Sequence, residues 1–287
     1  MEVTKVNLAI EAWREKVMAF DRYMEDIRGE EQGPGHGRSV FASEPVDPYR
    51  TDDPALNGLY EVVGEGAEIL DVGGGAGRFA LPLATRAKRV TVIDPSAESL
   101  ELLRTRVAEF GFTNLTAVED RWEEAEVPSG DVALCSWALH HVVEAAPFVR
   151  KLEESVKDRV VILEMMATPV SQMAPFYERV HGKSLTPLPG VQDLLNLLWA
   201  MDIFPDVTMV RPEIPVLGTD LDSTLEKLRR MLAVEEGTDA DERLRAAADE
   251  LLEESGEGLT VRGASMRRQA IVTWRPTRGG SSNGVPN

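Results

Sequence analysis

The stretch ILDVGGGAGRF, residues 69–79, decides the fold of this chain. An apolar run ends at Asp71 and Val72, and the loop that follows has no large side chains: it consists of Gly73, Gly74, Gly75, Ala76 and Gly77. A ligand can approach such a backbone closely, and the start of a helix offers unpaired N–H groups and positive potential. The stretch therefore predicts a strand, a ligand-binding turn and a helix over residues 78–87.

The spacing of the glycines narrows the choice of ligand. A dinucleotide-binding G-x-G-x-x-G loop would have Gly or Ala at position 78, where this chain has Arg78. A P-loop would continue with Gly-Lys and then Ser or Thr, and this loop does not. The pattern present is D-x-G-x-G-x-G, and the carboxylate of Asp71 would repel a pyrophosphate. These features disfavour a nicotinamide dehydrogenase.

Apolar runs alternate with helical segments after the loop. Strands are predicted over residues 89–94, 114–119, 131–137 and 159–166. Ser96 is suited to cap a helix that ends at Phe110. Continuous apolar strands separated by helices are typical of a parallel sheet covered on both faces. We therefore expect a doubly wound, mostly parallel α/β domain.

The remaining segments surround this domain. Residues 6–27 have the apolar spacing of an amphipathic helix, and the Gly- and Pro-rich stretch after them is long enough for a lid. Two acidic helices are expected over residues 220–255 and a last strand over residues 268–274. We therefore divide the chain into an N-terminal helix and lid loop (1–58), a main domain (59–275) with a helical insertion (213–258), and a disordered tail (276–287).

Composition limits the partners. The chain has 287 residues, with 31 Lys and Arg against 49 Asp and Glu, for a formal net charge of −18. Such a chain is repelled by nucleic acids and anionic membranes. Its one cysteine, Cys135, forms no intramolecular disulfide. No leader or membrane-spanning pattern is evident. We expect a cytoplasmic protein with a small-molecule partner, no nucleic-acid or membrane partner, and an oligomeric state left open, a homodimer included.

The glycine loop resembles motif I of the class I S-adenosylmethionine (SAM) dependent methyltransferases. Further landmarks follow in the family's order, each at a strand end: Asp94 after the second strand, Asp120 after the third, and DVALCSWALHHV over residues 131–142. The last resembles the D-x-V-x-S-x-x-x-L-H-H-V pattern of small-molecule methyltransferases. The match covers roughly residues 60–166 and the last strand. It implies a seven-stranded Rossmann-like sheet in the order 3-2-1-4-5-7-6.

The resemblance also implies a cofactor, SAM, released as S-adenosylhomocysteine, and residues that contact it. Besides the loop glycines, these are Asp71 (ammonium group or loop order), Asp94 with the following Pro95 (ribose hydroxyls), Asp120 (adenine amino group), Arg121 and Trp122 (cover of the adenine ring), and Ser136 on the fourth strand. The residues themselves leave two simpler roles open. Asp71 could only cap loop amides, and Asp94 could only cap the next helix.

The candidates for chemistry are His140 and His141, which follow the fourth strand, where ligands bind in open α/β sheets. A histidine of near-normal pKa could take a proton from an acceptor hydroxyl. The resemblance favours His141, although either ring could simply pack. No metal site is expected. The sequence thus predicts methyl transfer to a small molecule, with O-methylation favoured. The alternatives are a silent SAM-binding regulatory or scaffold protein, and a methyltransferase for protein or RNA.

Overall fold

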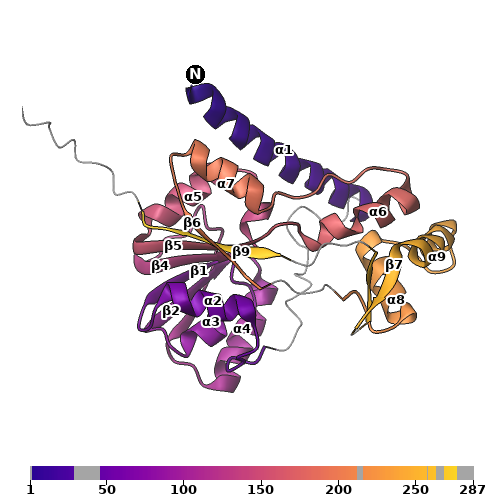
Figure 1. Cartoon of the computed structure of the whole chain (residues 1–287). Coiled ribbons are helices and arrows are strands. Elements are labelled where there is room, and N and C mark those ends of the chain that lie inside the picture. The colour runs from indigo at the N-terminus through magenta and orange to yellow at the C-terminus, as the bar shows by residue number, and fades with distance from the viewer. Residues whose placement is uncertain (1, 29–45, 212–215, 257, 263–267, 277–287) are drawn as a thin grey trace, which may run out of the picture. The chain divides into compact units, whose positions relative to one another are not determined.

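The structure is a computed structural model that describes residues 2–28, 46–211, 216–256, 258–262 and 268–276 (Figure 1). The expected disordered tail and most of the expected lid loop lie outside these residues. By their internal contacts the residues form two compact units. We call them the sheet unit (Arg38–Leu163, Met201–Thr208 and Ile271–Asn287) and the helical unit (Met1–Gly37, Glu164–Ala200 and Met209–Ala270).

A seven-stranded sheet has the order β3-β2-β1-β4-β5-β9-β6. Its strands are β1 (Glu68–Val72), β2 (Arg89–Asp94), β3 (Leu115–Glu119), β4 (Gly130–Ser136), β5 (Val156–Met165), β6 (Asp206–Met209) and β9 (Gln269–Trp274). Strand β1 pairs in parallel with β2 and β4, and the pairs β2–β3 and β4–β5 are parallel too. The order that the family resemblance implied is confirmed, with β9 in its penultimate place.

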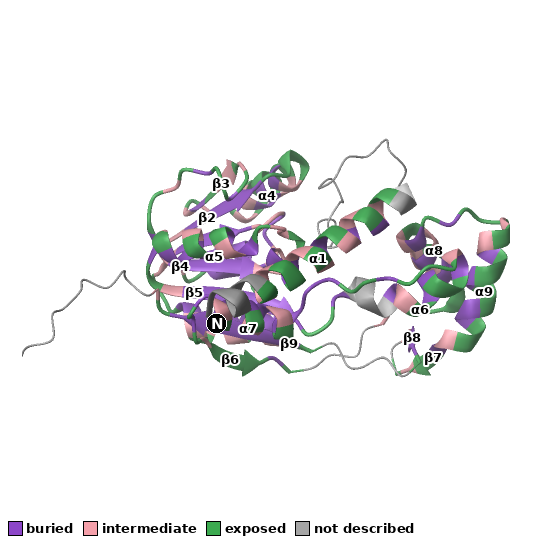
Figure 2. Cartoon of the chain, turned by 90° about the horizontal axis from the view of Figure 1, so that it is seen from above, coloured by how far each residue is buried: buried purple, intermediate pink, exposed green. Residues whose placement is uncertain are grey.

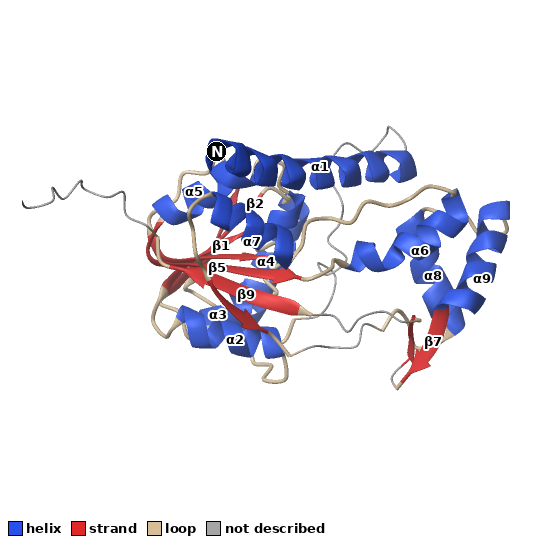
Figure 3. Cartoon of the chain, turned by 45° about the horizontal axis from the view of Figure 1, so that its top comes forward, coloured by secondary structure: helices blue, strands red, loops and turns tan. Residues whose placement is uncertain are grey.

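The central strands are buried almost throughout, which explains their continuous apolar sequences (Figure 2). Helices α2 (Pro54–Val63) and α3 (Ala80–Ala84) lie on one face of the sheet, and α5 (Ala145–Glu154) lies on the other (Figure 3). Helix α4 (Ala97–Phe110) starts as expected, because the Ser96 hydroxyl accepts a hydrogen bond from the Ser99 N–H.

Two helices of the sheet unit differ from expectation. Helix α3 is shorter than residues 78–87, because residues 75–79 form a turn that extends the glycine loop. Helix α2 was not expected, since its start lies in a Pro- and Asp-rich stretch. Its N-terminus is nevertheless well formed: Pro54 occupies the first turn, and the Asp53 carboxylate accepts hydrogen bonds from the N–H groups of Ala55 and Leu56.

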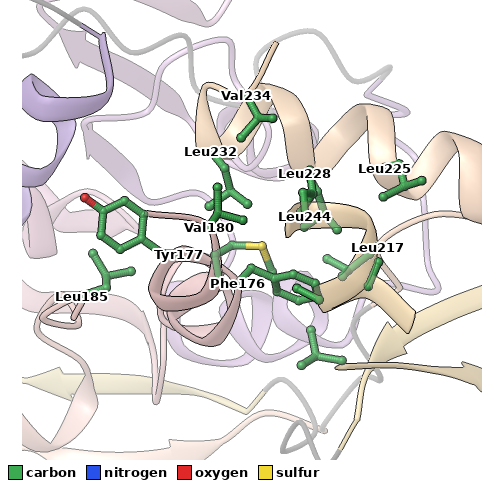
Figure 4. Packing of buried hydrophobic residues seen from close by; sticks show 14 of the residues in the cluster. Phe176, Tyr177, Val180, Leu185, Leu217, Leu225, Leu228, Leu232, Val234 and Leu244 are labelled. Carbon is green, nitrogen blue, oxygen red and sulfur yellow. The ribbon is translucent and has the colours of Figure 1, made fainter. Parts of the chain in front are cut away.

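The helical unit contains α1 (Glu2–Arg28), α6 (Pro169–His181), α7 (Val191–Ala200), α8 (Leu221–Leu232), α9 (Asp239–Leu251) and a hairpin of β7 (Leu252–Ser255) and β8 (Gly258–Val261). The expected long helix and the two acidic helices are confirmed; α6 and the hairpin were not expected. Helices α6, α8 and α9 bury a common apolar cluster (Figure 4) that includes Phe176, Leu228 and Leu244. Among the described residues, no helix is long and apolar enough to cross a bilayer.

Candidate functional site

The glycine loop is tied to the sheet at its first residue and closed into a turn at its last. The Gly73 N–H donates to the carbonyl oxygen of Ile93 on β2 (2.8 Å), and the Gly77 N–H donates to the carbonyl oxygen of Gly74 (3.0 Å). The Gly77 carbonyl in turn accepts from the Leu81 N–H on α3 (3.0 Å). The loop therefore has a defined shape at the carboxyl end of β1, where open α/β sheets bind their ligands.

The glycines serve different purposes. A Cβ on Gly73 would lie 2.5 Å from the Ala138 Cβ, and one on Gly77 would lie 2.5 Å from the Leu103 side chain, so these two glycines permit close packing. Gly75 differs. All three have a positive φ, but at Gly75 (+50°) the nearest described atom to a Cβ would be the Asp94 Oδ2 at 3.7 Å. The space that a Cβ would fill at Gly75 is therefore open and lies beside the Asp94 carboxylate. We call this space the open side of Gly75.

Asp71 lies directly under this loop. Its side chain is 1% exposed, and a Cβ on Gly74 would collide with its carboxylate. Neither carboxylate oxygen accepts a hydrogen bond from any described residue. Burial, together with the negative charge of Asp94, raises the pKa of Asp71 to about 7. Within the part of the chain that the structure describes, this carboxylate caps no loop amide and pairs with no counter-ion.

Asp94 ends β2 and holds the loop from the side. Its Oδ2 accepts the Gly75 N–H at 2.9 Å, and its Oδ1 accepts the Ser96 N–H at 2.8 Å. Burial raises its pKa, while these two N–H groups act in the opposite direction. The cap of α4 is Ser96, so Asp94 is not needed in that role. Each carboxylate oxygen can accept a further hydrogen bond, so a pair of ligand hydroxyls suits this group.

The three residues after β3 differ in how far they are buried. Asp120 is half-buried and accepts a hydrogen bond from the Arg121 N–H, while the Arg121 side chain is exposed. Trp122 is 3% exposed; its indole N–H donates to the Phe148 carbonyl oxygen (3.3 Å), and the Lys151 ammonium lies 5.0 Å from its ring centre. Its ring therefore packs in the core, and its role as cover of the adenine ring stays a prediction.

At the end of β4, Ser136 is half-buried, and its hydroxyl makes no hydrogen bond to the described part of the chain. The next residue, Trp137, has a φ of +54°, which is rare for a bulky residue. Its ring meets the Phe79 ring edge-on at 5.2 Å, and the Arg78 guanidinium lies 5.3 Å from the Trp137 ring centre. This aromatic and cationic group beside the loop was missed in the sequence, since only the fold brings positions 79 and 137 together.

The two histidines occupy one turn of 3₁₀ helix, η1 (Leu139–His141), with ring centres 4.4 Å apart. His140 is buried, whereas His141 is open to solvent. Removal of part of the His141 ring from water, together with the neighbouring His140 ring, lowers the pKa of His141. The role of His141 as a base stays a prediction. Its ring is neutral at pH 7 and is a weak base.

Together these groups suit a ligand that carries a cation and neighbouring hydroxyls. Asp71 offers a buried negative charge, Asp94 two acceptor oxygens, and Gly75 an open backbone between them. A phosphate would meet two carboxylates of its own sign. SAM, with an ammonium group, a sulfonium and a ribose, fits this set of residues.

Comparison with known proteins identifies the domain. Residues 69–159 match the family model of a methyltransferase domain. This part of the chain is a class I SAM-dependent methyltransferase domain. The methyltransferase region is 38% identical over 89 residues to a ubiquinone biosynthesis O-methyltransferase of Methylocella silvestris, covering 30% of this chain and 34% of the relative. The same-named protein of Vibrio cholerae is 34% identical over 104 residues, covering 35% and 40%.

The fold has solved counterparts. The YcgJ protein of Bacillus subtilis superimposes with a TM-score of 0.53 at 18% identity, over 76% of this chain and 96% of that one. The curated relatives are matched over only about a third to a half of their own length. The comparisons therefore establish the methyltransferase domain and its fold, and they leave the acceptor open.

The open side of Gly75 predicts that a larger residue at this position blocks SAM binding. Gly75→Val fills the space beside Asp94 and should abolish SAM binding in isothermal titration. Gly111→Val is the matched control, because Gly111 also has a positive φ (+73°) and no described atom lies within 4 Å of a Cβ there. Both variants strain the backbone alike, so only the first should lose the ligand. Normal SAM affinity in Gly75→Val would contradict the site.

The raised pKa of Asp71 predicts how stability and SAM affinity depend on pH. Its pKa of about 7 in the folded protein exceeds its unfolded value, so the folded state binds the extra proton. The stability of the ligand-free protein should therefore fall as pH rises from about 4 to about 7. A cationic ligand favours the ionised carboxylate. SAM affinity should thus increase with pH, by up to about tenfold per unit below about pH 7, and then level off.

Asp71→Asn separates this effect from other titrations, because the amide has the same shape and no charge. Titrations of SAM between about pH 5.5 and about pH 8 should show the slope in the wild type and a flat profile in the variant. A slope that persists in Asp71→Asn would assign the proton to another group.

Proposed function

We propose that this protein transfers the methyl group of SAM to a hydroxyl of a small-molecule acceptor. The observation that carries the proposal is the pairing of the Asp94 carboxylate with the Gly75 N–H (2.9 Å) beside the open side of Gly75. The buried Asp71 lies next to it without a hydrogen-bond partner among the described residues. This arrangement supports binding of a cationic nucleoside, and the match to a methyltransferase domain supports catalysis.

In this proposal each residue has a defined task. Asp71 attracts the ammonium group of the methionine part, Asp94 accepts from the ribose hydroxyls, and Asp120 accepts from the adenine amino group. Ser136 lies at the end of β4, the strand that pairs with β1, and contacts the same ligand. SAM supplies a methyl group already activated on a sulfonium. The protein therefore has to align the acceptor with it and exclude water.

The net charge of the chain and the position and pKa of His141 indicate the type of acceptor. A net charge of −18 disfavours RNA, and the relatives named above are O-methyltransferases of ubiquinone biosynthesis. His141 is solvent-accessible and follows the end of β4, so it can reach an acceptor that lies there. Because its pKa is lowered, it can assist only a hydroxyl that gives up its proton readily. We therefore propose a phenol-type hydroxyl as the acceptor rather than an aliphatic alcohol.

A methyl-transfer screen tests this function. Radiolabelled SAM should label members of a library of phenols and catechols, and it should not label matched aliphatic alcohols, amines or carboxylates. Tight SAM binding without transfer to any library member or to a cell extract would favour a regulatory SAM-binding protein. Transfer to protein or RNA in the extract alone would replace the small-molecule acceptor.

His141→Ala then tests the base. With an identified phenol, turnover should fall, but by less than the roughly 10²-fold or more that a base of near-neutral pKa supplies, while SAM affinity stays near the wild-type value. His181→Ala is the control, because His181 lies on α6 and its ring contacts the Leu232 carbonyl oxygen (3.0 Å) in the helical unit. Full turnover in His141→Ala would leave only alignment and water exclusion as the source of catalysis.

A further inference from the structure

A buried arginine contacts the glycine loop. Arg106 lies on α4, its side chain is 7% exposed, and its Nη1 donates a hydrogen bond to the carbonyl oxygen of Ala76 at 2.8 Å. Ala76 stands between Gly75, which opens toward Asp94, and Gly77, which packs on α4. The loop thus receives one charged side chain from β2 and another from α4.

The position of this arginine is unusual for its helix. The buried residues of α4 are Leu100, Leu103 and Arg106, a single stripe at helical spacing. A third leucine would continue the stripe without the cost of removing a charge from water. Burial lowers the pKa of Arg106, yet a guanidinium keeps its proton in proteins. The buried Arg106 guanidinium therefore indicates a role that depends on its charge or its hydrogen bonds, which a leucine could not supply.

The contact completes a clamp on the residues that face the ligand. The Asp94 carboxylate holds the Gly75 N–H (2.9 Å), and the Arg106 guanidinium holds the Ala76 carbonyl (2.8 Å). The two-residue segment between these groups is therefore fixed at both ends by charge-assisted hydrogen bonds. We infer that Arg106 is a positioning residue for the cofactor: it keeps the Gly75 backbone in the shape that SAM binds. This inference rests on the proposed SAM site.

Loss of the Arg106 hydrogen bond should weaken the binding of SAM. A loop of small residues has many accessible backbone conformations, and only the clamped one presents Gly75 beside Asp94. The apparent dissociation constant rises in inverse proportion to the fraction of molecules in the competent shape. Without Arg106, Leu103 still packs against Gly77, and the Gly77 carbonyl still accepts the Leu81 N–H on α3. The domain should therefore keep its fold while the segment of Gly75 and Ala76 gains freedom.

The experiment compares Arg106→Ala with Arg104→Ala, which removes an exposed arginine from the same helix. Isothermal titration should show SAM binding weakened at least about tenfold in Arg106→Ala and unchanged in Arg104→Ala. Millimolar methylguanidinium should restore most of the affinity of Arg106→Ala, because it can occupy the vacated space and donate to the Ala76 carbonyl. It should not change the wild type. Rescue of SAM affinity with no change in melting temperature separates positioning of the loop from a role in overall stability.

Arg106→Lys keeps the inference testable if the alanine variant does not fold. It retains the charge but loses the planar group, so SAM affinity should decrease several-fold at an unchanged melting temperature. Wild-type affinity in either variant would overturn the inference. So would a loss that follows the melting temperature and is not restored by methylguanidinium. Failure of the wild type itself to bind SAM would instead refute the proposed function.

Discussion

The hydrogen bond from the Gly75 N–H to the Asp94 carboxylate (2.9 Å) is the interaction on which the site depends. It joins the loop after β1 to the end of β2, two strands that parallel pairing already places side by side, with Val72 opposite Ile93. The bond holds Gly75, which has a positive φ, with its open side toward a carboxylate. The sheet brings these groups together, and this one bond makes them a binding surface.

The second constraint is the closeness of two acidic groups. Burial raises the pKa values of both Asp71 and Asp94, and the charge of Asp94 raises that of Asp71 further. Asp94 is compensated by two N–H groups, while Asp71 accepts no hydrogen bond from the described residues. The local field therefore favours a ligand with positive charge and disfavours phosphates. This is the same distinction that the D-x-G-x-G-x-G spacing made between sulfonium cofactors and dinucleotides.

The sequence predicted what depends on local patterns. Apolar runs located the sheet strands, and the positive-φ glycines marked the loop. Helix α2 carried a signal in Asp53 and Pro54, a cap followed by a first-turn proline, but the surrounding Pro and Asp residues resembled a loop. The burial of Trp122, the lowered pKa of His141 and the contact of Arg106 with the loop could not be predicted, because each arises from residues distant in the chain.

The close approach of Gly73 and Ala138, whose side-chain positions would be 2.5 Å apart if the glycine carried a Cβ, limits how this protein can change. Acceptor pockets are commonly reshaped by enlarging or exchanging residues at strand ends, and the end of β4 is the natural place to do so here. Position 73 has no room for a side chain, because a Cβ there would collide with the Ala138 side chain. Variation at the end of β4, whether in evolution or by engineering, therefore has to keep position 73 a glycine.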